Sequence, residues 1–279
     1  MKVLVTGANG QLGYDLIKEL NKRNIKNIGV DKNDFDITNQ SETENFILNS
    51  KPDAIIHCAA YTNVNKAENE KDLCYKINVD GTKNIASACK KIDAKMIYIS
   101  TDYIFDGKKN SPYEIDDNPN PLNFYGKTKL DGENIIKNSL EKYFIVRISW
   151  VFGKNGNNFV KTMLNLSQTQ NELNIVSDQI GSPTYTVDLS KILCDMVLTD
   201  KYGIYHATNE NYCSWYEFAQ EIFKISDIKI KLNPVETKDF PSKAKRALNS
   251  RLSKKKLPES NFSKLPTWQN ALARFLKEI

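Results

Sequence analysis

Histidine and cysteine are both scarce in this sequence of 279 residues, which has only two histidines and five scattered cysteines without a C-x-x-C pair. This scarcity argues against a histidine-rich metal centre, a thiolate zinc site or a disulfide framework, so we expect no bound metal. No apolar run approaches the ~18 residues of a membrane helix, and we therefore expect no membrane association. The first residues also lack the long apolar core of a secretion signal, so we expect a cytoplasmic protein.

Charge of one sign is not concentrated anywhere along the chain. The 39 lysines and arginines exceed the 34 aspartates and glutamates only slightly, for a net charge of +5. Such a mild excess suits an anionic small molecule but lacks the basic stripe of a nucleic-acid-binding protein, so we expect no nucleic-acid partner. Hydrophobic residues at 40% and charged residues at 26% are ordinary for a globular protein with one large or two modest domains.

Short apolar runs alternate with helix-length amphipathic segments through the first half of the chain, which predicts an α/β fold with a Rossmann-type, doubly wound parallel sheet. The expected strands are residues 3–6, 27–31, 54–58, 95–100 and 144–148, and the expected helices between them are residues 12–23, 40–50, 78–92 and 125–138. Beyond residue 150 we expect helices at 158–168, 214–225 and 267–277 and strands at 173–177 and 203–207. We assign residues 1–150 to a dinucleotide-binding domain, which strands near 173–177 and 203–207 would join, and residues 151–279 mainly to a smaller mixed α/β substrate-binding lobe.

A glycine-rich segment joins the first expected strand to the first expected helix, and its candidate cofactor-binding residues are Gly7, Asn9, Gly10, Gln11, Leu12 and Gly13. Glycines permit a tight turn and close backbone approach, so a pyrophosphate can lie against the amino terminus of the helix. Asp31 ends the second strand, where a carboxylate can bind the adenosine ribose and favour NADH. Lys32 beside it can pair with a 2′-phosphate, so NADPH and NADH both remain open.

Tyr125 and Lys129 stand at positions i and i+4 of an expected helix and therefore on one face, whereas Lys127 points elsewhere. A free tyrosine has a pKa near 10, and a nearby ammonium would lower that pKa toward the useful range for acid-base catalysis. Thr101 follows the strand at 95–100, at the sheet edge where dinucleotide-dependent sites form. There it can donate a hydrogen bond to a substrate oxygen.

Eight segments in order resemble the dTDP-4-dehydrorhamnose reductases, a family within the extended short-chain dehydrogenase/reductases. They are TGANGQLG (6–13), CAAYTNVNKAE (58–68), INVDG (77–81), STDYIFDG (100–107), PLNFYGKTKLDGE (121–133), RISWVF (147–152), NNFVKTML (157–164) and DQIGSPT (178–184). The joint pattern is far more specific than any single segment.

The resemblance implies reduction of the C4 keto group of a dTDP-linked 4-keto-6-deoxy sugar, dTDP-4-dehydro-L-rhamnose, to dTDP-L-rhamnose by NADPH or NADH. It implies that Tyr125 donates the proton, Thr101 holds the substrate oxygen, and Lys129 binds the nicotinamide ribose beside Tyr125. The further cofactor-binding residues that it implies are Asp36, Ile37, Cys58, Ala59, Ala60 and Tyr61. The further substrate-binding residues are Asp102, Tyr103, Trp150, Asn158 and Arg246, and Asn78 would hold the sheet together.

The sequence departs from the family in two places. Some relatives bind Mg²⁺ at a dimer interface through glutamates, but here Asp15 stands at one such position and no matching glutamate follows residue 184. We therefore expect no structural Mg²⁺ and leave monomer or homodimer open. Arg246 lies in a segment that lacks the family's proline.

Three other functions compete with this interpretation. A sugar-nucleotide dehydratase would carry an acidic residue where Tyr103 stands, so the sequence favours simple carbonyl reduction. Another nucleotide-linked ketosugar remains open as substrate, because the substrate lobe is the least informative part of the chain. A non-catalytic NADP-binding regulatory subunit of methionine adenosyltransferase shares the fold, but retention of Thr101, Tyr125 and Lys129 favours catalysis.

Overall fold

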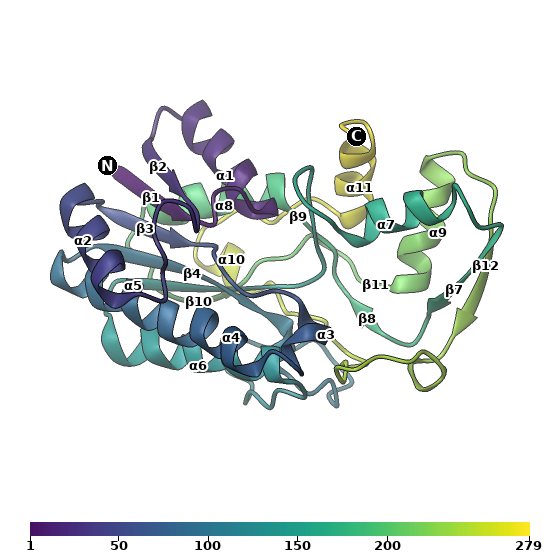
Figure 1. Cartoon of the computed structure of the whole chain (residues 1–279). Helices are drawn as coiled ribbons and strands as arrows, with labels where there is room; N and C mark the ends of the chain where they lie inside the picture. Colours follow the sequence, from purple (N-terminus) through teal and green to yellow (C-terminus); the bar gives the residue numbers. More distant parts are fainter.

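The computed structural model describes residues 1–279 and is built on a six-stranded sheet (Figure 1). The strands lie in the order β10-β5-β4-β3-β1-β2, and every neighbouring pair is parallel. Their bounds are Lys2–Thr6 (β1), Lys26–Val30 (β2), Ala54–His57 (β3), Lys95–Thr101 (β4), Tyr143–Ile148 (β5) and Gly203–His206 (β10). The central strands are rich in Val and Ile because both faces of the sheet are buried.

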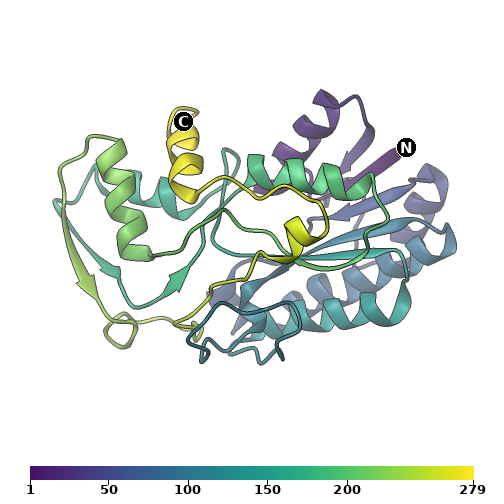
Figure 2. The same ribbon diagram turned by 180° about the vertical axis from the view of Figure 1, so that it is seen from behind.

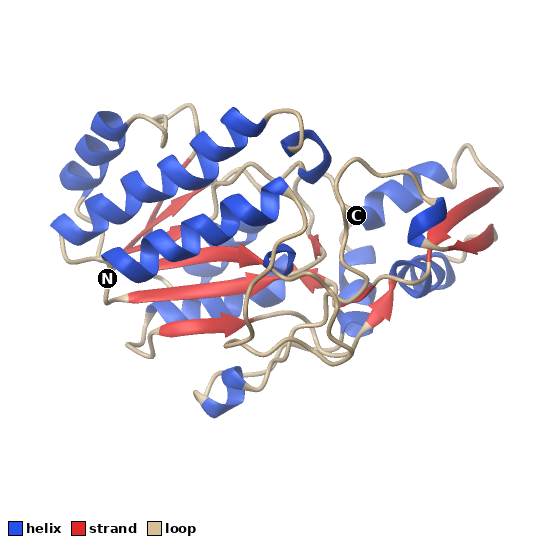
Figure 3. Ribbon diagram, turned by 90° about the horizontal axis from the view of Figure 1, so that it is seen from below, coloured by secondary structure: helices blue, strands red, loops and turns tan.

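Helices cover both faces of the sheet, and Figure 3 shows those of one face lying across the strands. On one face lie α1 (Gln11–Lys22), α8 (Thr186–Val197) and the short α10 (Lys256–Glu259), which share a core with the strands. On the other lie α2 (Gln40–Ser50), α5 (Gly81–Lys91) and α6 (Phe124–Ser139). The predicted doubly wound α/β fold is therefore confirmed.

A second lobe lies beside the sheet and has its own hydrophobic core (Figure 2). Its helices are α7 (Phe159–Leu166), α9 (Trp215–Ile225) and α11 (Trp268–Leu276). Its strands form three short pairs: β6 (Val151–Phe152) with β9 (Thr184–Tyr185), β7 (Glu172–Val176) with β12 (Lys231–Val235), and β8 (Ile180–Gly181) with β11 (Cys213–Ser214).

The chain crosses between the two lobes more than once. Strand β10 joins the edge of the main sheet, as expected for residues 203–207, and α8 packs against α1. The expectation that residues 173–177 would join the same sheet is wrong, because Leu173 and Ile175 bury their side chains in the core of the second lobe. An apolar alternation shows that a strand is half-buried but not which core it faces. The boundary at residue 150 stays a prediction.

The connection between β3 and α5 contains two short helices, α3 (Val64–Ala67) and α4 (Lys71–Tyr75), and a π-helical turn at Lys76–Asp80. The helix expected at 78–92 therefore begins earlier and includes one wide turn, a feature often found near functional sites. Two 3-10 turns, Asp102–Ile104 and Thr237–Asp239, complete the elements. None of the helices has both the length and the apolar character needed to cross a membrane.

The strand order places β1 between β2 and β3, so the chain leaves β1 toward one side of the sheet and later continues toward the other. In open parallel sheets, ligands bind at this reversal, beyond the carboxyl ends of the strands. Thr6 ends β1, His57 ends β3 and Thr101 ends the next strand, β4. The loops that follow these residues form the candidate site.

Candidate active site

The loop between β1 and α1, together with the first turn of α1, forms a glycine cradle around Gly7, Gly10 and Gly13, and some of its positions accept only glycine. Gly7 has a φ of +67°, and a Cβ built on it would lie 2.8 Å from the backbone nitrogen of Ala59. A Cβ on Gly13 would lie 2.2 Å from the carbonyl oxygen of Gly7. No side chain caps the amino terminus of α1, where Gly10 is the N-cap. Close backbone approach and an uncapped helix terminus fit a dinucleotide pyrophosphate.

The predicted ribose-binding carboxylate lies beside this loop. The amide of Asn9 donates a hydrogen bond to Asp31, and the backbone N–H of Asn33 donates to the same carboxylate at 2.7 Å. Lys32 is exposed next to it. Asp31 and Lys32 thus lie next to each other at the end of β2, where both were expected. Asp31 can bind the adenosine ribose of NADH and Lys32 can pair with the 2′-phosphate of NADPH, so the structure is compatible with either cofactor.

Asp36 and Ile37 lie farther along the same connection and have structural contacts. The carboxylate of Asp36 accepts a hydrogen bond from the backbone N–H of Thr38 at 2.8 Å. Ile37 packs so closely on Gly81 that a Cβ there would lie 2.9 Å from its side chain. Both residues shape the loop next to the glycine cradle, and their contact with a cofactor remains a prediction.

The segment Cys58–Tyr61 follows β3 and closes the other side of the cradle. The backbone N–H of Ala59 donates to Thr6 Oγ1 at 3.2 Å, which ties this segment to the end of β1. Asn78 accepts a hydrogen bond from the N–H of Tyr61 at 2.8 Å and donates to Thr128 Oγ1 at 3.0 Å. Asn78 therefore holds the segment Cys58–Tyr61 against α6, whereas it was expected to hold the sheet together.

Helix α6 brings the two predicted catalytic side chains to the carboxyl end of the sheet. It begins after Asn123, whose side chain caps it by accepting from the N–H of Gly126 at 2.8 Å. A Cβ on Gly126 would lie 2.2 Å from the carbonyl oxygen of Tyr103, so glycine lets the helix approach the turn after β4. Tyr125 is 9% exposed and Lys129 is 2% exposed, whereas Lys127 points into solvent.

Thr101 meets Tyr125 where β4 ends. Thr101 is buried close to Tyr125, and Thr101 Oγ1 donates to Asp102 Oδ1 at 3.0 Å. The ring of Tyr103 packs edge-on against that of Tyr125 at 5.6 Å between centroids. Residues from a strand end and a helix start, distant in the chain, thus form one cluster of hydroxyl groups beside the glycine cradle.

The expected electrostatic effect of Lys129 on Tyr125 is wrong. Burial, followed by the negative charge of Asp102, raises the pKa of Tyr125 above its ordinary value, so the expected lowering is not found. The Lys129 ammonium lies 4.0 Å from the centre of the Tyr98 ring instead. Burial also lowers the pKa of Lys129 to about 7, because a charged group loses solvation inside the protein. Helical spacing put the two side chains on one face but did not fix where the ammonium lies.

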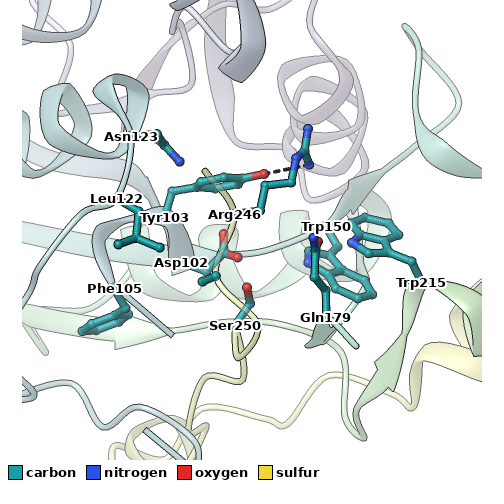
Figure 4. Close-up of a pocket in the computed structure, with 11 residues that line it drawn as sticks. Asp102, Tyr103, Phe105, Leu122, Asn123, Trp150, Gln179, Trp215, Arg246 and Ser250 are labelled. Carbon is teal, nitrogen blue, oxygen red and sulfur yellow. Dashed lines mark hydrogen bonds between the residues drawn. The ribbon is translucent and has the colours of Figure 1, made fainter. Parts of the chain in front are cut away.

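A pocket opens from this cluster toward the second lobe (Figure 4). Four of its lining residues were predicted to bind substrate: Asp102, Tyr103, Trp150 and Arg246. Arg246 donates to the Tyr103 hydroxyl at 3.0 Å. Trp150 lies flat on Trp215, with ring centroids 3.6 Å apart, and both indoles reach the pocket.

The sequence did not identify several other residues of this pocket: Phe105, Leu122, Asn123, Gln179, Trp215, Ala247 and Ser250. Gln179 lies inside the segment 178–184 and Ser250 lies four residues after Arg246, so both were within segments already singled out. Trp215 lies in no such segment. It reaches the site because α9 directly follows β11, and β11 pairs with β8 from a distant part of the chain.

Asn158 lies away from this pocket, at the junction of the lobes. Its side chain caps α7 by accepting from the N–H of Lys161 at 3.1 Å. Its amide nitrogen donates to the carbonyl oxygen of Gly153 at 2.9 Å and to the side chain of Gln11 at 3.1 Å. Asn158 thus joins the second lobe to the glycine cradle, and its predicted substrate contact remains untested.

The histidines and Asp15 have structural partners. His57 is hydrogen-bonded to Thr6 at 2.7 Å, and burial lowers its pKa to about 3. His206 contacts the carbonyl oxygen of Ser253 and is likewise buried, with a pKa lowered to about 3. The buried carboxylate of Asp15 accepts a hydrogen bond from Thr186. No group of three or more His, Cys, Asp and Glu side chains gathers in the structure.

Comparison with known proteins agrees with this geometry over the whole chain. The family model described as the RmlD substrate binding domain matches residues 1–279. The chain is 40% identical to the spore coat polysaccharide biosynthesis protein SpsK of Bacillus subtilis, over 99% of this chain and 97% of that protein. It is also 40% identical to a dTDP-4-dehydrorhamnose reductase of Aggregatibacter actinomycetemcomitans, over 97% of each chain.

A solved structure shares the complete fold. The crystal structure of dTDP-4-dehydrorhamnose reductase from Bacillus anthracis, in complex with NADP, superposes with a TM-score of 0.97 at 45% identity, covering 100% of this chain and 99% of that one. Sequence family and fold agree over the whole chain. This chain therefore belongs to the dTDP-4-dehydrorhamnose reductase family.

Proposed function

We propose that the protein reduces the C4 keto group of dTDP-4-dehydro-L-rhamnose to dTDP-L-rhamnose with NADPH or NADH. The observation that carries this proposal is the buried cluster of Thr101, Tyr125 and Lys129 beside a glycine cradle, in a chain of this family. Its relative from Aggregatibacter actinomycetemcomitans is named for this activity. A dTDP-linked 4-keto-6-deoxy sugar is therefore the substrate class.

The cofactor would lie along the carboxyl edge of the sheet. Gly7, Gly10 and Gly13 would hold its pyrophosphate, and Asp31 its adenosine ribose. The segment Cys58–Tyr61 would lie along the nicotinamide half. When bound, the reduced nicotinamide supplies the hydride that reaches C4 of the sugar.

The side chains of the chain supply the proton and the orientation. Tyr125 would donate its phenol proton to the C4 oxygen, and Thr101, buried close to it, would hold that oxygen in place. Lys129 is buried near Cys58, so it lies within reach of the segment Cys58–Tyr61. There it would bind the nicotinamide ribose.

The pocket between the lobes would bind the rest of the substrate. Trp150 would pack its indole against the sugar ring, with Trp215 fixing that indole from behind by stacking. Arg246 would contact the diphosphate, since a guanidinium suits bidentate contact with phosphate oxygens. The pocket contains Asp102 and Tyr103 on the side nearer to Tyr125, where the sugar would lie.

Replacing Lys129 with methionine should weaken NADPH binding by about 10- to 100-fold and also lower turnover. Methionine fills the same buried space but removes a charged donor, and hydrogen bonds of charged groups contribute about 1.5–3 kcal/mol. The matched control is Lys127→Met, because Lys127 lies on the same helix but is exposed. Titration of cofactor fluorescence measures both variants. Unchanged NADPH affinity in Lys129→Met would remove the ribose contact.

The proposed function is tested by supplying the purified protein with NADPH or NADH and the dTDP-linked 4-keto sugar. We expect loss of reduced-nicotinamide absorbance and formation of dTDP-L-rhamnose, identified by mass spectrometry and NMR. Turnover only with a different nucleotide-linked ketosugar would correct the substrate. No turnover, together with tight binding to methionine adenosyltransferase, would select the regulatory alternative. The cytoplasmic location, the monomeric or homodimeric state and the absence of membrane and nucleic-acid partners remain predictions.

A further inference from the structure

Gln179 lies in the wall of the substrate pocket, and the mechanism above gives it no role. Only 6% of its surface is exposed, yet it lines the pocket together with Trp150 and Arg246 (Figure 4). Its amide nitrogen, Nε2, donates to Thr237 Oγ1 at 3.0 Å, whereas its amide oxygen, Oε1, has no hydrogen-bond partner in the protein. Because Oε1 is unpaired but not sealed inside the protein, it is open to the pocket.

The hydrogen bonds behind Gln179 fix which end of its amide faces the pocket. Thr237 Oγ1 lies 2.6 Å from Asp178 Oδ1, and a carboxylate can only accept, so the hydroxyl of Thr237 donates its proton to Asp178. The lone pairs that remain on Thr237 Oγ1 can only accept, so they require an N–H from Gln179. This network places Nε2 toward Thr237 and presents Oε1 to the pocket as an acceptor.

The backbone that carries Gln179 is also held in place, against the indole of Trp150. Ile180, the next residue, accepts a hydrogen bond from the backbone N–H of Ser250 at 2.7 Å. Gly181 lies so close to Trp150 that a Cβ on it would be 2.6 Å from the indole carbon Cε2. The amide oxygen and the indole therefore share one corner of the pocket. An aromatic surface beside a fixed polar group is a common arrangement for orienting a small ligand.

We propose that Gln179 determines specificity for the substrate sugar: its Oε1 accepts a hydrogen bond from a hydroxyl group of the hexose while the ring packs against Trp150. The inference rests on the proposed function and adds a polar contact by which the pocket recognises the sugar. The keto oxygen and the diphosphate oxygens have no proton to donate, so they cannot bond to Oε1. The donors left in the substrate are the hexose hydroxyls and the nucleoside, and the position beside Trp150 favours the hexose.

Replacing Gln179 with methionine tests this contact, because methionine has a similar volume but no amide oxygen. Calorimetric titration compares dTDP-L-rhamnose with dTDP, two ligands that share the nucleoside and the diphosphate but differ in the hexose. We expect Gln179→Met to weaken binding of dTDP-L-rhamnose by about 3- to 10-fold, the effect of one neutral hydrogen bond, and to leave the affinity for dTDP unchanged. The matched control, Gln220→Met, changes an exposed glutamine of α9 and should alter neither affinity.

A second variant, Thr237→Val, tests the fixed orientation of the amide. Valine keeps the shape of threonine but removes the hydroxyl that holds Nε2, so the amide of Gln179 can rotate and turn its donor toward the pocket. We expect a smaller loss of affinity than in Gln179→Met, again for dTDP-L-rhamnose and not for dTDP. With the keto sugar and NADPH, kcat/KM should fall in the same order, because the hydroxyl contact is present in the substrate as well.

The outcomes distinguish this inference from the proposed function. If the protein is an active reductase but Gln179→Met loses affinity for both ligands by the same factor, or for neither, the inference is overturned and the function stands. If the protein does not oxidise NADPH with the keto sugar but its preference for dTDP-L-rhamnose over dTDP depends on Gln179, the inference stands and the function fails. No turnover and no such dependence would contradict both.

A crystal structure of the unmodified protein with dTDP-L-rhamnose provides the same test if Gln179→Met does not fold. A hexose hydroxyl within about 3 Å of Gln179 Oε1 would support the inference, since this is the ordinary length of such a hydrogen bond. A hexose without a hydroxyl at that distance would overturn it.

Discussion

Replacing Tyr125 with phenylalanine is expected to lower turnover by about 10²-fold or more, the effect of removing a positioned proton donor. The phenol is almost fully buried, so no water can easily take its place at the substrate oxygen. The phenylalanine ring preserves the contact with Tyr103. NADPH affinity and the free energy of unfolding should therefore change little. Steady-state kinetics measure the loss of turnover, and cofactor titration measures the NADPH affinity.

The matched control is Tyr202→Phe, which removes a tyrosine hydroxyl bonded to exposed Asp200 at 2.8 Å, away from the candidate site. Its turnover should equal that of the unmodified protein. Full activity in Tyr125→Phe would end the assignment of Tyr125 as the proton donor. A large loss of NADPH affinity in the same variant would show that the phenol acts mainly in binding.

Replacing Arg147 with methionine should lower the free energy of unfolding by about 3–5 kcal/mol. Arg147 and Glu133 form a fully buried ion pair in which Nε and Nη2 each donate to the carboxylate at 2.9 Å. Removing the guanidinium leaves the charge of Glu133 without its partner inside the protein. Because Glu133 lies on α6 and Arg147 on β5, this pair also fixes the helix that carries Tyr125.

Urea unfolding measures this effect, with Arg23→Met as the comparison. Arg23 pairs with Glu19 and Asp195 near the surface, and such pairs contribute about 0–1 kcal/mol. The double variant Arg147→Met/Glu133→Leu should recover part of the lost stability, since no unpaired charge remains. A cost below about 1 kcal/mol for Arg147→Met would mean that water or another group compensates Glu133.

The sheet and its helices could be predicted because their information is local. A buried parallel strand is a short apolar run, and the glycines at 7, 10 and 13 mark the turn that follows β1. The expected strand at 95–100 differs from the observed Lys95–Thr101 by one residue. The helical spacing of Tyr125 and Lys129 also predicted that they share one face of a helix, and in the structure both are buried on α6.

Electrostatics and long-range packing could not be predicted in the same way. The sequence places Lys129 near Tyr125 but does not show that its ammonium lies over the ring of Tyr98, or that burial dominates both pKa values. Likewise, Trp215 reaches Trp150 only through the fold of the second lobe. Such effects depend on the depth and direction of side chains, which residue spacing alone does not encode.

The central claim is that this chain delivers a hydride to C4 of a dTDP-linked ketosugar while Tyr125 protonates the oxygen. Its most direct test is to run the reaction with NADPH that carries deuterium at the transferable position of the nicotinamide. The account predicts one deuterium on C4 of the dTDP-L-rhamnose product, seen by NMR, and the same labelling at a much lower rate in Tyr125→Phe. Deuterium at another carbon, or a product without deuterium, would contradict it.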